Sequence, residues 1–236
     1  MKSFILILFL SCQISICLAQ FSKEEFVKLW GDSLPNYDPE NKLYYDYRED
    51  MDNLYIALYK KDNAQKAIIQ GGVQLQFDKD KITDKSFRIT FSHKFPDPNN
   101  PQKTGDKKEY FLLENLGEIK NLLVPRYNEY GIQVRYDFNI DRSHIPEPEG
   151  PDRWIRSEDI KKNKSTFWAE LSIPKKYLSA SKVHVKICLR GIDLMKEGIE
   201  GQIRKGLWGT PNNTIYDQEN RELKYFTEHQ FIINLN

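Results

Sequence analysis

Apolar and polar residues alternate with a period of two over most of the chain after residue 43. The clearest run is 132–141, where apolar residues occupy the even positions and polar residues the odd ones. Side chains of a β-strand point alternately to the two faces of a sheet, so this run predicts a half-buried strand and excludes a helix. Further strands are predicted at 73–77, 87–91, 167–173, 183–189 and 231–235. The aromatic run 43–47 and the apolar run 54–59, separated by an acidic turn, predict a hairpin.

Two segments show helical spacing instead. Ser22 and Glu25 have the spacing of a capping box, apolar residues follow on one face, and Gly31 ends the pattern, which predicts a short N-terminal helix. The segment 114–123 carries leucine or isoleucine at 116, 119, 122 and 123, and predicts a second short helix.

This order of elements predicts an all-β fold. About eight or more strands with short helices and regular spacing favour an antiparallel β-sandwich of jelly-roll or immunoglobulin-like type. The proline-rich segments 95–108 and 145–151 are interpreted as loops at the ends of one sandwich, because strands of the same character lie on both sides of each. Residues 20–236 are therefore expected to form a single domain.

The first nineteen residues have the layout of a secretory signal peptide. Lys2 precedes an apolar run from Phe4 to Leu10, and Ala19 supplies a small residue at the expected cleavage site. Polar residues interrupt the run too early for a membrane span, which needs about 20 apolar residues. We therefore expect an exported protein, periplasmic or extracellular, with no membrane span.

The charge balance changes little when this segment is removed. The chain has 35 Lys and Arg against 34 Asp and Glu, and removing Lys2 leaves 34 of each. A neutral protein lacks the basic surface that nucleic-acid binding requires, so no nucleic-acid partner is expected. Cys188 is the single cysteine after residue 19. It lies in an apolar strand pattern, so we predict a buried, inert thiol and no internal disulfide.

Short signatures of catalysis are absent from the sequence. The four histidines, His93, His144, His184 and His229, are isolated, and no zinc-binding pair, nucleophile elbow or phosphate loop occurs. His184 is expected to point outward from its strand. The sequence therefore favours a non-enzymatic protein, although a dispersed pair of carboxylates, as in glycosidases, stays open.

Two carboxylate clusters raise the question of calcium. Neither supplies the six to eight oxygen ligands that calcium prefers, and lysines flank the first cluster. We interpret both as solvated faces and predict no metal or other cofactor. The clusters are Asp78, Asp80 and Asp84, and Asp137, Asn139 and Asp141.

Tryptophans are the candidate ligand-binding residues. Trp168 is predicted on the strand face opposite the core, next to Glu170, while Trp154 and Trp208 lie in loop-like segments. Exposed indole rings stack on sugar rings, so these four residues form the predicted site. Covering the edges of the core is the alternative role for each tryptophan.

The segments Trp30–Ser33, Tyr37–Asp46 and Asp52–Leu58, with several later ones, resemble parts of exported bacterial domains related to family 9 carbohydrate-binding modules and DOMON-like sandwiches. Ala169-Glu170-Leu171-Ser172-Ile173-Pro174 is similar to a late strand of these domains that ends in Ile-Pro, and the Ala19-Gln20 boundary suits exported Gram-negative proteins. The other segments that carry the resemblance are Ala67–Asp78 and the glycine-rich Gly191–Gly209.

The resemblance implies a β-sandwich used for binding, often of sugars and in some relatives of haem. The paired tryptophans of the sugar-binding modules have no counterpart at matching positions, and neither Met51 nor Met195 matches a haem ligand of the pattern. We therefore expect a secreted carbohydrate-binding domain. The alternatives are a cell-envelope structural or protein-interaction module and a glycan-active hydrolase.

Overall fold

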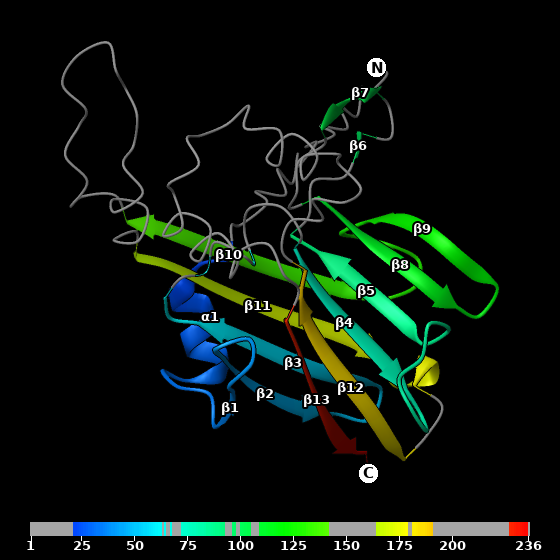
Figure 1. The fold of residues 1–236 in the computed structure, drawn as a ribbon, viewed down its shortest axis with the longest axis horizontal. Helices are drawn as coiled ribbons and strands as arrows, with labels where there is room; N and C mark the ends of the chain where they lie inside the picture. The colour runs from blue at the N-terminus through cyan, green and yellow to red at the C-terminus, as the bar shows by residue number, and fades with distance from the viewer. Residues whose placement is uncertain are drawn as a thin grey trace, which may run out of the picture.

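The described residues of the computed structural model form two large antiparallel β-sheets stacked into a sandwich, a separate two-stranded sheet, and one α-helix on the outside of the sandwich (Figure 1). The structure describes residues 21–62, 64, 67, 72–92, 96–97, 100–104, 109–141, 164–178, 181–190 and 227–235. The predicted all-β fold is confirmed. Within the described residues, no helix is both long enough and apolar enough to cross a membrane.

The first sheet, called sheet A, has five strands, and the second, called sheet B, has six. Every pairing within them is antiparallel. In order across sheet A the strands are β1 (Asn36–Asp38), β2 (Leu43–Glu49), β3 (Asn53–Lys60), β11 (Lys164–Pro174) and β10 (Gln133–Asp141). In order across sheet B they are β13 (Thr227–Asn234), β12 (Lys182–Leu189), β4 (Val73–Asp78), β5 (Phe87–Phe91), β8 (Tyr110–Leu116) and β9 (Ile119–Pro125).

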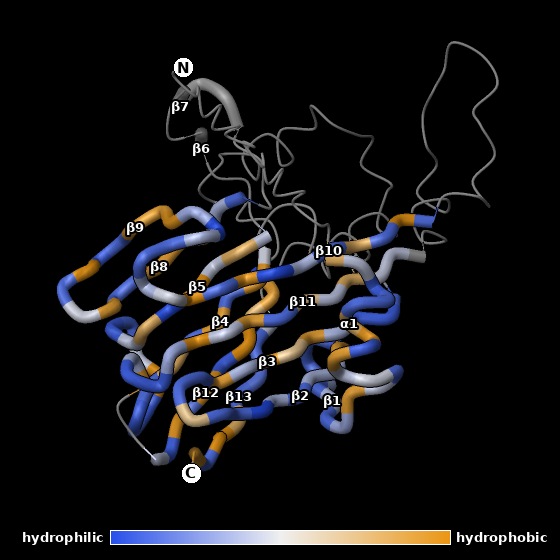
Figure 2. Tube along the Cα trace, turned by 180° about the vertical axis from the view of Figure 1, so that it is seen from behind, coloured by the Kyte–Doolittle hydropathy of each residue, from blue (hydrophilic) through white to orange (hydrophobic). Residues whose placement is uncertain are grey.

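The main core lies between the two sheets, and alternation along each strand supplies it. Figure 2 shows hydrophobic and hydrophilic residues following one another along the strands of both sheets. Leu75 in β4, Ile89 in β5 and Ile56 in β3 are each 0% exposed. Each such side chain contributes about 1.5–3 kcal/mol when it leaves water, so the core is the main source of stability.

The predicted N-terminal helix is confirmed as α1 (Lys23–Trp30). The Ser22 side chain accepts the Glu25 amide, and the Gly31 amide donates to the Val27 carbonyl at 2.7 Å. Gly31 has a φ of 90°, a conformation that L-residues with a side chain rarely adopt, so glycine ends the helix. The helix lies on the outer face of sheet A beside β3 and β11 (Figure 1).

The prediction of a helix over 114–123 is wrong, because this segment forms the hairpin of β8 and β9. Leu116 and Ile119 are cross-strand partners on either side of a tight turn, and Leu113 pairs with Leu122. Partners that flank a two-residue turn are three positions apart in sequence, which is also the spacing of one helical turn. Gly117, with a φ of 59°, reverses the chain.

The predicted loop at 95–108 contains two short strands in its described part, β6 (Pro96–Asp97) and β7 (Asn100–Thr104), which pair with each other. The predicted loop at 145–151 lies outside the described residues. Strand β11 ends at Pro174, and a short 3-10 helix, η1 (Lys175–Tyr177), follows it.

A buried polar turn between β1 and β2 ties the two sheets together. Asp38 is 0% exposed and accepts the Asn41 backbone amide at 2.9 Å and its side-chain amide at 2.6 Å. Asn41 in turn donates to the Ile187 carbonyl in β12 at 3.1 Å and accepts the Thr227 hydroxyl of β13 at 2.6 Å. This turn therefore fixes the edge of sheet A against sheet B.

Candidate functional site

Trp168 lies on the outer face of sheet A, as predicted, but it is not accessible. It is 5% exposed and packs in an aromatic cluster beneath α1, and its indole N–H donates to the Phe21 carbonyl at 2.9 Å. The N-terminal segment folds back over β11 and covers this face, so the expectation of an exposed ring is wrong. This helix-side cluster consists of Phe21, Phe26, Trp30, Leu34, Ala57, Tyr59 and Trp168.

Glu170 is held by the same helix. Its carboxylate accepts the Trp30 indole N–H at 2.6 Å and the Arg135 guanidinium at 2.5 Å. Arg135 also donates to Glu25 in α1 at 2.7 Å, so one carboxylate and one guanidinium attach the helix to β10 and β11. The geometry assigns Glu170 to helix docking and leaves its carboxylate fully engaged.

The other two predicted site residues, Trp154 and Trp208, lie outside the described residues. The structure therefore brings Trp168 and Glu170 together, beneath α1.

The outer face of sheet B carries a different set of polar side chains. Val73, Leu75 and Phe77 of β4 point into the main core, so Gln74 and Gln76 point away from it. Cross-strand partners share a face, which extends this set over the neighbouring strands. We call the following set the polar face: Gln74, Gln76, Arg88, Thr90, Glu114, Lys186, Cys188 and Glu228.

The centre of the polar face is unusually well shielded. Gln74, Gln76 and Thr90 are 9%, 8% and 0% exposed, although they face away from the core. Antiparallel sheets commonly leave one face in water, and polar side chains there are then solvated. Shielded amides instead need protein partners or a bound molecule to satisfy their hydrogen bonds.

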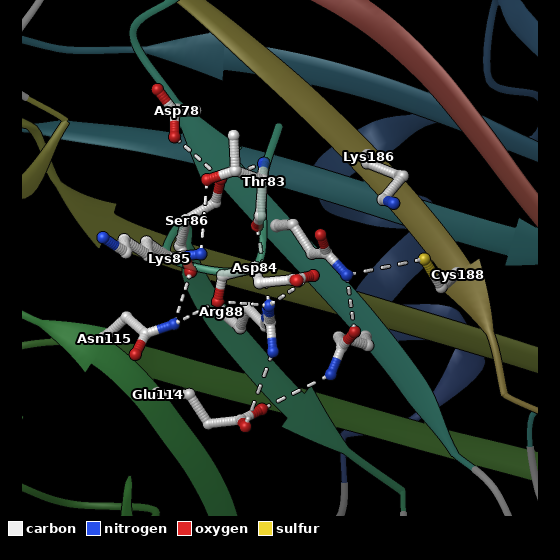
Figure 3. A network of polar contacts seen from close by, with 12 residues as sticks. Asp78, Thr83, Asp84, Lys85, Ser86, Arg88, Glu114, Asn115, Lys186 and Cys188 are labelled. Carbon is white, nitrogen blue, oxygen red and sulfur yellow. Dashed lines mark hydrogen bonds and ion pairs between the residues drawn. The ribbon is translucent and has the colours of Figure 1, made fainter. Parts of the chain in front are cut away.

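Hydrogen bonds link these side chains into a row across the strands, between Cys188 and Glu114, which are labelled in Figure 3. The Gln76 side-chain amide donates to Gln74 Oε1 at 2.7 Å and, more weakly, to Cys188 Sγ at 3.9 Å. The Gln74 amide donates to Thr90 Oγ1 at 2.9 Å and to Glu114 at 3.4 Å. No donor in the described part of the chain reaches Gln76 Oε1, which keeps an open acceptor on this face.

Two ion pairs, each of one cation and one anion, border this row. Arg88 lies 3.8 Å from Glu114, and Lys186 lies 3.0 Å from Glu228. Their side chains are 16–40% exposed, so the pairs lie at the boundary between the shielded row and solvent. The Arg88 Nε–H is buried and has no hydrogen-bond partner. Two cations and two anions leave the polar face without net charge.

The loop between β4 and β5 supports Arg88 from one end of the polar face (Figure 3). Arg88 donates to the Asp84 carbonyl, and Asp78 accepts the Ser86 hydroxyl at 2.7 Å and the Asp80 amide at 3.2 Å. Partial burial raises the pKa of Asp78, but these and other hydrogen bonds outweigh it and leave the pKa below its usual value. The first carboxylate cluster, Asp78, Asp80 and Asp84, therefore lies at the end of β4 and in the loop after it, where its hydrogen bonds stabilise the loop.

Cys188 is buried, as predicted, at 4% exposure. Burial raises the pKa of its thiol to about 11, so the thiol is protonated at neutral pH. The thiolate is the nucleophilic form of cysteine, and the geometry at Cys188 therefore suits packing and a weak hydrogen bond.

No group of three or more His, Cys, Asp or Glu side chains within the described ranges is arranged to hold a metal ion. The second carboxylate cluster differs from its interpretation as a solvated face, because Asp137 is 3% exposed. Its neighbour Asn139 is exposed.

Accessible aromatic rings lie on the other sheet, where the sequence did not single them out. Tyr37 in β1 is 50% exposed, and its ring centre lies 5.0 Å from that of Tyr44 in β2. The Lys61 ammonium lies 4.8 Å from the Tyr44 ring centre. Alternation within β1 and β2 could have identified this pair, since both tyrosines occupy outward positions.

The sequence did not predict the polar face either, although alternation placed Gln74, Gln76 and Arg88 on outward positions. Nothing local to those residues indicates that they are shielded or that they form one row. The chain matches no family model, no curated protein and no solved structure.

Proposed function

We propose that this protein is an exported, non-enzymatic β-sandwich domain that binds carbohydrate on the polar face of sheet B. The observation that carries the proposal is the shielded row of amides, with an open acceptor at Gln76 Oε1 and balanced charges along its border. Binding sites for small molecules commonly combine a sheltered surface with a few well-placed polar groups.

The charge balance favours a neutral ligand. A site for phosphate or nucleic acid carries an excess of Lys and Arg, whereas Arg88 and Lys186 are each paired with a carboxylate here. Sugars present many hydroxyl groups that both donate and accept hydrogen bonds. Neighbouring amide, guanidinium and carboxylate groups provide donors and acceptors at close spacing, which matches this pattern.

Trp154 and Trp208, which lie outside the described residues, stay the candidates for ring stacking on this ligand from the sequence alone. Trp168 and Glu170 are withdrawn from the ligand-binding set, because the helix occupies both.

A glycan array followed by calorimetry tests the proposal. Gln76→Ala should weaken the sugar selected on the array by at least about tenfold, which corresponds to roughly 1.4 kcal/mol, a typical cost of losing a buried hydrogen-bonding partner. Gln133→Ala is the matched control, because Gln133 is an exposed amide on β10 of the other sheet. Trp154→Ala and Trp208→Ala measure the stacking contribution.

Three results would contradict the proposal. The wild-type protein binds no glycan on the array, or Gln76→Ala binds the selected sugar as tightly as Gln133→Ala does. Release of a shortened sugar or a new reducing end during incubation would show a glycan-active hydrolase and not a binding domain. Far-UV circular dichroism of each variant checks that it is folded.

Export is a separate part of the proposal. It rests on the apolar run and small residue within positions 1–19. Intact-mass measurement of protein recovered from the periplasm or medium of a Gram-negative host should give a chain that begins at Gln20. Recovery of the full chain from the cytoplasm alone would contradict it.

A further inference from the structure

Strand β9 forms a free edge of sheet B. It pairs with β8 and with no other strand of the described residues, and it lies at the margin of the molecule in both views (Figures 1 and 2). The Arg126 amide donates to the Glu109 carbonyl at 2.7 Å, which orients the end of β9. Because successive backbone groups of a strand point to opposite sides, those of Asn121 and Leu123 face away from β8.

This edge has little of the protection that terminal strands usually carry. Charged residues, prolines and short length discourage sheets from pairing edge to edge. Sheet A ends in the three-residue β1 and in β10, which contains Arg135, Asp137 and Asp141. Strand β9 has seven residues, with Lys120 as its one charge and its one proline, Pro125, at the last position, and Leu122 at its centre is 37% exposed.

We propose that β9 pairs with β9 of a second copy of this chain, antiparallel and centred on Leu122. The two copies of sheet B then form one continuous sheet across a twofold axis. In this register the outward backbone groups of Asn121 meet those of Leu123 in the second copy, and each N–H finds a carbonyl. Leu122 meets Leu122 at a position without backbone bonds, where side chains come closest.

Charge complementarity selects this register. Glu118, in the turn just before β9, and Arg126, just after it, flank the strand, so antiparallel pairing brings Glu118 of one copy near Arg126 of the second copy, and symmetry repeats the pair at the other end. Neither residue has an ion-pair partner within its own chain among the residues described. Lys120 falls opposite Val124, so the two lysines do not face each other. A second copy of the chain therefore suits the edge in hydrogen bonding, apolar contact and charge.

Sedimentation equilibrium of the full-length protein over a concentration series tests the pairing. The wild type should dimerise, and Leu122→Lys should raise the dimer dissociation constant at least tenfold, because the twofold axis brings two ammonium groups together. Ile232→Lys is the matched control, since Ile232 is an exposed apolar residue on β13, at the opposite edge of the same sheet, and 43% exposed.

A charge exchange separates loss of pairing from loss of folding. Glu118→Arg should raise the dissociation constant by about 2–30-fold, because each cross-strand pair occurs twice. The double variant Glu118→Arg with Arg126→Glu should return it to within about threefold of wild type. A wild-type protein that is monomeric throughout, a dimer that Leu122→Lys and Glu118→Arg leave unchanged, or a dimer lost on Ile232→Lys overturns the proposal.

Discussion

Replacing Trp168 by alanine distinguishes a tryptophan that holds α1 on sheet A from one that binds a ligand. The change removes one of the two tryptophan side chains of the helix-side cluster and the hydrogen bond to the Phe21 carbonyl at 2.9 Å. Truncation of a buried aromatic residue to alanine costs about 3–5 kcal/mol. Because the Trp168 ring packs against Phe26 and Trp30 of α1 in this cluster and its N–H holds the segment before the helix, we expect a loss within this range.

Trp168→Phe isolates the hydrogen bond. It keeps most of the apolar volume but leaves the Phe21 carbonyl without its donor, which costs about 1–3 kcal/mol when the acceptor is shielded from water. Trp168→Ala should therefore destabilise the protein more than Trp168→Phe does. Tyr127→Ala, at a residue that is 66% exposed, should stay within about 0.5 kcal/mol of wild type.

Urea unfolding followed by far-UV circular dichroism measures these differences without relying on tryptophan fluorescence. With a slope of about 2 kcal/mol per molar, Trp168→Ala should lower the midpoint by about 1.5–2.5 M. Calorimetry with the selected sugar should show unchanged affinity for Trp168→Phe. A Trp168→Ala protein within about 1 kcal/mol of wild type, or a Trp168→Phe protein that is stable but no longer binds sugar, would refute the structural role.

Three further variants and conditions follow from the structure. Cys188 should resist a thiol reagent in the native protein at pH 7.5 and react after unfolding. Because its pKa is raised to about 11, the contribution of the thiol to stability should be present below about pH 9 and be lost as the pH rises toward 11. Urea unfolding at a series of pH values measures this loss. Ser86→Ala should cost about 1.5–3 kcal/mol of stability at pH 7, because it removes a hydrogen bond to the Asp78 carboxylate. The pKa of Asp78 is lowered in the folded protein, so its contribution to stability is lost as the pH falls through that pKa, and the difference from wild type should shrink in acid. Equal losses at pH 7 and pH 2.5 would contradict this. Gly117→Ala should destabilise the protein by about 1–2 kcal/mol in thermal unfolding. The cost comes from the φ of 59° alone, since no atom lies within 4 Å of an added Cβ. An unchanged melting temperature would show that the turn tolerates a side chain.

The strands were the most predictable part of this fold, because alternation is a property of neighbouring residues. The run 132–141 became β10, and Ser22 with Gly31 marked the two ends of α1. The hairpin of β8 and β9 was missed because Leu116 and Ile119 have the same separation in a tight hairpin as in a helical turn. Periodicity over a few residues does not distinguish these two structures.

The candidate site was less predictable than the fold. Glu170 contacts Trp30 and Arg135, which are 140 and 35 positions away in sequence, and no local pattern of Glu170 indicates either partner. Gln74 and Gln76 occupy polar positions of an alternating strand, a pattern that is typical of a solvated face. Their burial depends on what lies over the sheet, so it became visible only in the folded chain.

The sequence by itself therefore determined the elements and the class of fold, since strand period, helix caps and turn residues act over a few neighbouring positions. Tertiary structure decided which outward faces are covered. It placed α1 over Trp168 and Glu170, and it assembled the polar face of sheet B from β4, β5, β8, β12 and β13. The physical reason is that burial and hydrogen-bond partnership depend on contacts between distant segments, which the order of residues along one strand does not specify.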